Sequence, residues 1–96
     1  MTIEKTVEGN KAVLRPEGWL DTQNAAEFGA AIDSLGEEIT ELTVDMEKLE
    51  YISSAGLRLI VAAHKKMNGE MVIINPSIEI LDVFRMTGFD KRLNIK

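Results

Sequence analysis

The start of the chain contains two short strand-like runs, residues 3–7 and 11–15, in which β-branched and other apolar residues lie among polar ones. Short runs of this kind, bounded by turn residues, are typical of strands. The two runs are joined by Gly9 and Asn10, residue types that tolerate the positive φ of a tight turn. The pattern therefore predicts a β-hairpin at the start of the chain.

The next segment has helical spacing. Its apolar positions recur at intervals of three or four residues: Ala25, Phe28, Ile32 and Leu35. Asp21 or Thr22 is expected to cap this amphipathic helix, and Gly36 is placed to end it.

Two further apolar runs, Leu42–Met46 and Met71–Ile74, are short and rich in branched side chains. Such runs fit strands that are covered on both faces, as parallel neighbours usually are. Between them, a helical pattern starts just after Ser53 and Ser54 and stops near residues 68–69. This succession predicts a right-handed β-α-β crossover.

The end of the chain follows the same logic. The tripeptide Asn75-Pro76-Ser77 supplies a cap and a first-turn proline for a third helix, which Gly88 closes. Residues 89–96 are expected to form a short terminal strand or a docked tail. The order of elements predicts one α/β domain over residues 1–96, with a mixed β-sheet that has an N-terminal hairpin and is covered by helices.

Composition narrows the function classes. The length of 96 residues fits one domain, and the absence of cysteine excludes disulfides and thiolate metal sites. A formal net charge of −5 argues against nucleic-acid binding, which needs a basic face. No apolar run approaches the ~20 residues that cross a bilayer, and the start of the chain lacks the pattern of a signal peptide. We therefore expect a cytoplasmic protein without direct membrane insertion.

Catalytic chemistry finds little support. His64 is the only histidine, and it follows Ser54 by ten residues along one expected helix, roughly 15 Å away by the α-helical rise. No glycine loop that would cradle phosphates is present, and the carboxylates show no spacing typical of metal ligands. Asp45 is expected to cap the turn after its strand. The sequence predicts neither an enzyme nor a metal or cofactor site.

The segment Ser53-Ser54-Ala55-Gly56 opens the second expected helix. Either serine is a good N-cap, because its hydroxyl accepts a hydrogen bond from the first helical turn. Glycine in that turn costs up to roughly 1 kcal/mol relative to alanine. We therefore expect another backbone segment to approach Gly56 closely.

Two stretches of the sequence resemble a known family. Residues 45–58 read Asp-Met-Glu-Lys-Leu-Glu-Tyr-Ile-Ser-Ser-Ala-Gly-Leu-Arg, which resembles the signature of STAS-domain anti-sigma-factor antagonists. The earlier segment Gly18-Trp-Leu-Asp21 looks like the second landmark of that family. Together with the order of elements, the resemblance covers essentially the whole chain.

The resemblance implies a binding switch. An unmodified member binds an anti-sigma factor serine kinase and thereby releases sigma factor, and phosphorylation of one serine cancels the binding until a phosphatase acts on the phosphoserine. Aligned through Gly56 and Leu57, that serine is Ser54, with Ser53 as the alternative. Many members carry aspartate before this serine and a hydroxyl residue after it, where this chain has Ser53 and Ala55.

The partner-binding residues expected from these arguments are Asp21, Asp45, Ser53, Ser54, Gly56, Leu57 and Arg58. Arg58 lies one turn beyond Ser54 and either pairs with a phosphate or partner acids or stays solvated. Trp19 is expected to pack at the core boundary, with anchoring of a partner as the alternative. The alternative function is that of a non-phosphorylated STAS subunit of a lipid transporter or signalling scaffold.

Overall fold

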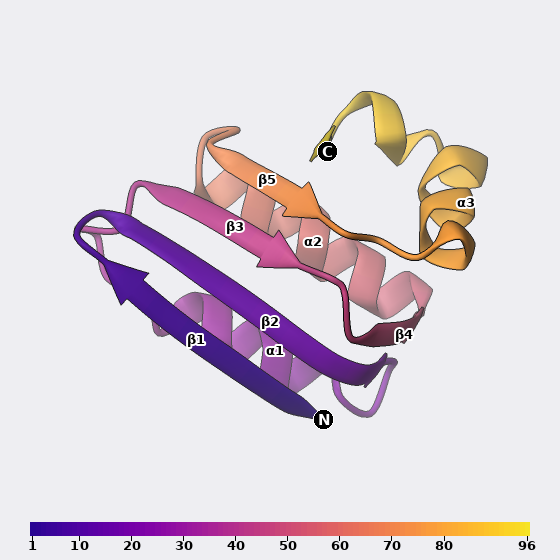
Figure 1. Ribbon diagram of the computed structural model, residues 1–96, viewed down its shortest axis with the longest axis horizontal. Helices are drawn as coiled ribbons and strands as arrows, with labels where there is room; N and C mark the ends of the chain where they lie inside the picture. The colour runs from indigo at the N-terminus through magenta and orange to yellow at the C-terminus, as the bar shows by residue number, and fades with distance from the viewer.

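A mixed β-sheet of six strands forms one layer of the computed structural model, which describes residues 1–96. The elements are β1 (Thr2–Glu8), β2 (Lys11–Leu20), α1 (Ala25–Asp33), β3 (Glu41–Asp45), β4 (Leu49–Ile52), α2 (Ser54–Lys66), β5 (Met71–Ile74), α3 (Ile78–Thr87), a 3-10 turn (Phe89–Lys91) and β6 (Asn94–Ile95). The strand order is β1-β2-β3-β5-β6, and β4 pairs with β2 alone. Helices α1 and α2 lie behind the sheet, and α3 lies at one end (Figure 1).

The predicted mixed sheet with an N-terminal hairpin is confirmed. β1 and β2 pair antiparallel around a turn in which Gly9 has a φ of 61°. β2 pairs parallel with β3, and β3 pairs parallel with β5, so α2 belongs to a parallel crossover. Residues 89–96 were expected to form a short terminal strand or a docked tail. They contain the short strand β6, which pairs parallel with β5.

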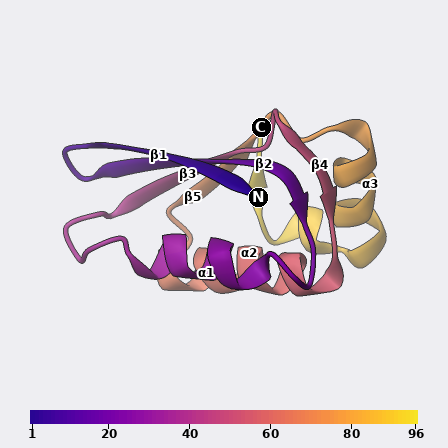
Figure 2. The same cartoon turned by 90° about the horizontal axis from the view of Figure 1, so that it is seen from below.

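The helices cover only one face of the sheet, with α1 and α2 side by side beneath it (Figure 2). Along β3, Leu42 and Val44 are buried in the core, whereas Thr43 and Asp45, which alternate with them, are only partly buried. The expectation of strands covered on both faces is therefore wrong. Thr43 and Asp45 are polar enough to face the open side, which makes this run an alternating strand.

β4 is a strand that the apolar pattern did not predict. β2 pairs with β3 as far as Leu14 and with β4 from Gly18 onward, so the long strand changes partners on the way. A register shift between Gly18 and Trp19, where Gly18 has a φ of 101°, accompanies the change. Beyond it, the end of β2 and β4 together bend toward the helix layer (Figure 2).

Two predicted helix starts need correction. Residue Asn24 precedes α1 as its N-cap without a side-chain hydrogen bond, so neither Asp21 nor Thr22 caps that helix. Asp21 Oδ1 instead accepts hydrogen bonds from the backbone N–H groups of Gln23 and Asn24, which shapes the turn before α1.

The third helix also starts two positions later than predicted, because Asn75 and Pro76 were expected to be its cap and its first helical residue. Ser77 is its N-cap, so Pro76 precedes the cap and does not occupy the first turn. The predicted end is confirmed, because Gly88 takes the left-handed conformation with a φ of 77°.

The core is a single cluster of 21 buried hydrophobic residues, and no polar or charged side chain is buried with them. Its members come from the strands, from their connections and from the buried positions of α1, α2 and α3. No helix combines the length and the apolar character that a membrane span requires.

Candidate protein-binding site at the start of α2

Ser53 joins the end of the sheet to the start of α2. It is the N-cap in an extended conformation, and its Oγ accepts a hydrogen bond of 3.2 Å from the N–H of Gly56. Its own N–H donates to the carbonyl of Leu20 at 2.9 Å. The capping role expected for one of the two serines is thus confirmed for Ser53, whose hydroxyl is engaged inside the chain.

Ser54 is the first residue of α2, and its side chain is exposed to solvent. The first turn of α2 contains no acidic residue, so the positive end of the helix dipole is not countered there. An exposed hydroxyl at this point is accessible to a modifying enzyme. An anionic group attached to it would meet a favourable helix terminus.

Gly56 lies where no side chain fits. A Cβ built on it would come within 2.8 Å of both the carbonyl oxygen and the Cγ of Leu20, and within 2.9 Å of Cγ1 of Ile52. The predicted close approach of another backbone segment to Gly56 is therefore confirmed. This contact presses the start of α2 against the end of β2.

The next two residues point in different directions. Leu57 is 5% exposed and belongs to the core, so its side chain can support a binding surface only from beneath. Arg58 is exposed. None of the four ion pairs in the structure involves it. It remains available for a partner or for a phosphate one turn away.

Asp21 is connected to the serines by a backbone hydrogen bond of its neighbour. It follows Leu20, whose carbonyl accepts from the N–H of Ser53. The partly buried Asp21 carboxylate already accepts two backbone hydrogen bonds of 3.0 Å in its own turn. Asp21 therefore belongs to the same end of the molecule as Ser53, with one of its carboxylate oxygens committed to local structure.

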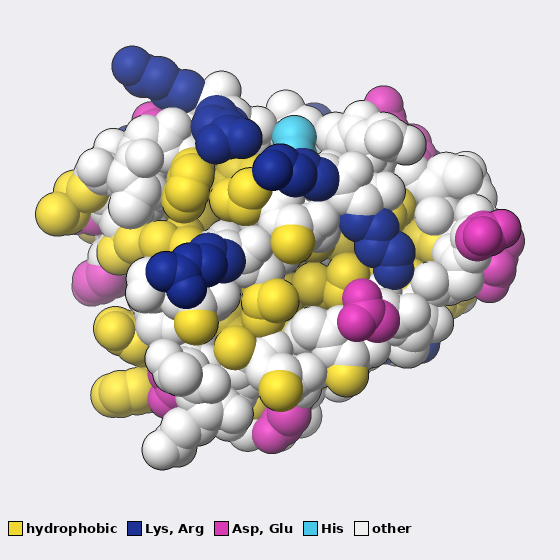
Figure 3. Space-filling view, turned by 180° about the vertical axis from the view of Figure 1, so that it is seen from behind, with side chains coloured by type: hydrophobic (Ala, Val, Ile, Leu, Met, Phe, Trp, Pro, Cys, Tyr) yellow, Lys and Arg dark blue, Asp and Glu magenta, His cyan; other side chains and the backbone are white.

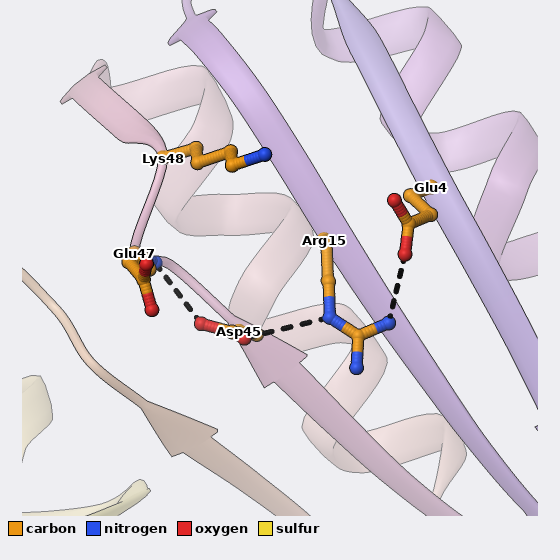
Figure 4. A pocket seen from close by; sticks show the side chains of 5 residues that line it. All are labelled: Glu4, Arg15, Asp45, Glu47 and Lys48. Carbon is orange, nitrogen blue, oxygen red and sulfur yellow. Dashed lines mark hydrogen bonds and ion pairs between the residues drawn. The ribbon is translucent and has the colours of Figure 1, made fainter.

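Asp45 lies apart from this group, on the open face of the sheet (Figure 4). Its Oδ1 accepts hydrogen bonds of 3.1 Å from the N–H of Glu47 and from Nδ2 of Asn75, and its Oδ2 lies 3.5 Å from Nε of Arg15. Arg15 also pairs with Glu4 at 3.2 Å. The expected turn-capping role of Asp45 is confirmed.

A hollow of about 380 Å³ adjoins this network, lined by Glu4, Arg15, Asp45, Glu47 and Lys48. β4 separates Asp45 from the serines, because it takes the chain from the sheet layer to the helix layer (Figure 2). Contact of Asp45 with the same partner as Ser54 stays a prediction. Its visible role is to fix the end of β3.

The sequence analysis considered only one member of an aromatic pair that lies near the serines in the chain. Trp19 and Tyr51 are register partners on β2 and β4, with ring centroids 5.3 Å apart at 42°. Trp19 is 56% exposed and Tyr51 45% exposed. Tyr51 was missed because β4 was not predicted, and without β4 nothing pairs it with Trp19.

No group of three or more histidine, aspartate and glutamate side chains is arranged to hold a metal ion. The chemistry available at this end of the molecule is that of an exposed hydroxyl, a free guanidinium and two aromatic rings. Such a site suits protein recognition and covalent modification of Ser54.

A comparison with known protein families agrees with the sheet topology and with the serine-glycine start of α2. The profile of the STAS domain matches residues 2–96, and the chain belongs to this family. The family resemblance drawn from residues 45–58 and 18–21 is confirmed.

Individual relatives agree with this assignment. The candidate anti-sigma factor antagonist BtrV of Bordetella bronchiseptica is 34% identical over 80 residues, covering 76% of this chain and 66% of BtrV. The crystal structure of a candidate anti-sigma factor antagonist of Thermotoga maritima has a TM-score of 0.88 at 18% identity, covering 97% of this chain and 84% of that one. SpoIIAA of Bacillus in its phosphorylated form has a TM-score of 0.76 at 21% identity, covering 99% and 91%. The structural likenesses show that the fold is shared.

Proposed function

We propose that this chain is an anti-sigma factor antagonist controlled by phosphorylation. The unmodified protein binds an anti-sigma factor serine kinase and so sets sigma factor free. Phosphorylation of Ser54 ends that binding, and a phosphatase that removes the phosphate restores it. The chain itself catalyses none of these steps.

The proposal depends on the observation that the two serines differ in what their hydroxyl groups contact. Ser53 uses its hydroxyl as the N-cap, whereas Ser54 presents its hydroxyl to solvent at the first helical position. A kinase can reach Ser54 without disturbing the cap. The relatives named as anti-sigma factor antagonists support the class of function, and a solved SpoIIAA in phosphorylated form supports a phosphorylated member of this fold.

Electrostatics gives the switch a physical basis. α2 contains no acidic residue, and its basic side chains Arg58, Lys65 and Lys66 are exposed. Lysine and arginine side chains spread over the helix side of the molecule, although the chain as a whole is acidic (Figure 3). A partner that docks there is expected to present carboxylates.

A phosphate on Ser54 would reverse the local sign of charge. It adds about −1.5 to −2 charges, which the helix terminus tolerates but which an acidic partner surface does not. Each loss of ~1.4 kcal/mol in binding free energy weakens the complex tenfold, so a few kcal/mol suffice to dissociate a micromolar complex. Release then requires no unfolding of the domain.

The modification site is tested by mapping phosphate directly. The purified chain is incubated with ATP and with each anti-sigma factor kinase encoded in its own genome, and the product is digested for mass spectrometry. We expect phosphate on Ser54, none in Ser54→Ala, and normal labelling in the matched control Ser77→Ala. Phosphate on Ser53 would move the site, and no transfer by any of these kinases would contradict the proposal.

The switch is tested by affinity. We expect phosphorylated protein, and Ser54→Asp to a smaller degree, to bind the kinase at least about tenfold more weakly than the unmodified chain. Ile78→Asp adds the same charge at the first residue of α3 and should bind normally. A stable complex that is indifferent to both phosphate and Ser54→Asp would instead favour the transporter or scaffold subunit.

A further inference from the structure

Trp19 and Tyr51 form an aromatic pair at the surface of the domain. The chain has one tryptophan and one tyrosine, and the structure places them against each other on neighbouring strands, at 56% and 45% exposure. Removing large aromatic rings from water is favourable, so a partner that covers these rings would gain binding free energy. Because the two rings already contact each other, their side chains lose less rotamer freedom when a partner covers them.

The surroundings of the pair are acidic. Residues 17–22 and 47–52, which hold the two rings, contain four carboxylates and one lysine: Glu17, Asp21, Glu47, Glu50 and Lys48. Glu50 directly precedes Tyr51, Glu17 lies two residues before Trp19, and both glutamates are exposed. The four ion pairs of the structure join other residues, so these glutamates have no cationic partner within the chain.

We infer that the Trp19–Tyr51 pair is the anchor that receives an arginine-bearing segment of the anti-sigma factor. A guanidinium over an aromatic face is attracted by the ring, and the unpaired carboxylates of the same two strand segments strengthen its approach by their negative charge. Tryptophan, tyrosine and arginine are also the residues that most often dominate binding energy at interfaces. This inference rests on the proposed function, because it names the chemistry of the same partner.

The anchor and the serine are joined through the backbone at one end of the molecule. The N–H of Ser53 donates to the carbonyl of Leu20, the residue after Trp19, and Tyr51 precedes Ser53 by two residues. The partner surface is therefore two-signed: cationic opposite the rings, and acidic opposite the exposed base of α2. Phosphate on Ser54 acts on the acidic half and leaves the anchor itself unchanged.

The first experiment measures kinase affinity for single variants of the full chain. We expect Trp19→Ala to weaken binding about 10- to 100-fold, and Trp19→Phe, which retains a ring, to weaken it much less. Val7→Ala is the matched control, because Val7 is 50% exposed on β1, outside the proposed surface. It should bind within twofold of the unaltered chain.

The second experiment needs no natural partner. The indole N–H of Trp19 gives a single resonance in a ¹H–¹⁵N spectrum, because the chain has one tryptophan. We expect N-acetyl-arginine amide to shift this resonance at millimolar concentration and N-acetyl-norleucine amide to leave it in place. The shift should shrink in added salt and in the double variant Glu17→Gln, Glu50→Gln.

The outcomes separate the two proposals. If the kinase binds and Ser54→Asp weakens binding while Trp19→Ala does not, the anchor is wrong and the proposed function stands. If no kinase binds the unaltered chain, the proposed function fails, and the arginine titration alone decides whether the pair accepts a guanidinium. Equal shifts from both amides, or no shift from either, would overturn the anchor.

Discussion

Helices α2 and α3 begin in the same way and differ in what the first turn contacts. Each has an extended serine as its N-cap, and each serine accepts one hydrogen bond from the third helical residue: Ser53 from Gly56 at 3.2 Å and Ser77 from Ile80 at 3.1 Å. The third residue of α3 is the buried Ile80, which fills core volume. The third residue of α2 is a glycine with no room for a Cβ.

This difference shows which parts of the α2 start serve folding alone. A cap and a core side chain are sufficient to begin α3, so a capping role accounts for Ser53 but not for its neighbours. Gly56 sacrifices helix propensity to bring the helix against the end of β2, and Ser54 occupies a position where α3 has the exposed Ile78. The start of α2 thus combines a cap, a close contact with β2 and an exposed serine.

The largest effect on stability is expected at Gly56. In Gly56→Ala the new Cβ would lie 2.8 Å from the Leu20 carbonyl oxygen, a backbone atom that cannot move aside cheaply. Overpacking of this kind costs about 1–3 kcal/mol, of which the better helix propensity of alanine recovers ~1 kcal/mol. We expect a net loss of up to roughly 2 kcal/mol in the free energy of unfolding, measured by urea denaturation.

Gly29→Ala is the matched control within α1. A Cβ there would meet only the Leu59 side chain, at 3.5 Å or more, which is ordinary van der Waals contact. This substitution should raise stability by up to about 1 kcal/mol. If Gly56→Ala were equally stabilising, the close approach would not be what requires glycine, and the contrast between the two helix starts would lose its basis.

Elements that depend on local interactions could be predicted from the sequence, whereas an element that depends on distant contacts could not. The hairpin, the glycine end of α3 and the crossover follow from local turn chemistry and from periodicity, and all are present. β4 was missed because its four residues, Leu-Glu-Tyr-Ile, are too few to show a period, and in the structure two exposed residues lie between the two buried ones. Its pairing depends on a register shift in β2 that no local pattern encodes.

The same limit applies to the site. The cap formed by Ser53 and the tight fit at Gly56 could be predicted because both residues belong to one short helix start, whereas the role of Ser54 stays a prediction. The position of Asp45 relative to them depends on β4, which leads the chain away from the open face of the sheet before α2 begins (Figure 2). The partnership of Trp19 with Tyr51 depends on the same unpredicted strand. Contacts across the missed strand were therefore the part that sequence reasoning could not supply.

A middle-sized effect tests whether the two caps are equivalent. Ser53→Ala and Ser77→Ala each remove one side-chain acceptor from a first turn, and each should cost about 1 kcal/mol of unfolding free energy. Equal losses in parallel thermal and urea titrations would show that capping is alike in α2 and α3. A much larger loss for Ser53→Ala would mean that Ser53 also holds the junction between β2 and α2.

The smallest effect separates loss of binding from loss of folding. Ser54→Asp and Ile78→Asp both place a negative charge at the first residue of a helix, where the dipole favours it by about 0.3–1 kcal/mol. The gain should be larger at Ser54, because the first turn of α2 contains no acid whereas that of α3 already contains Glu79. Salt should reduce both gains, since both positions are exposed. If Ser54→Asp lowered the unfolding free energy instead, its loss of kinase binding could come from a damaged helix start. A Ser54→Asp variant that is as stable as the unaltered chain and no longer binds would assign the switch to the contact surface alone.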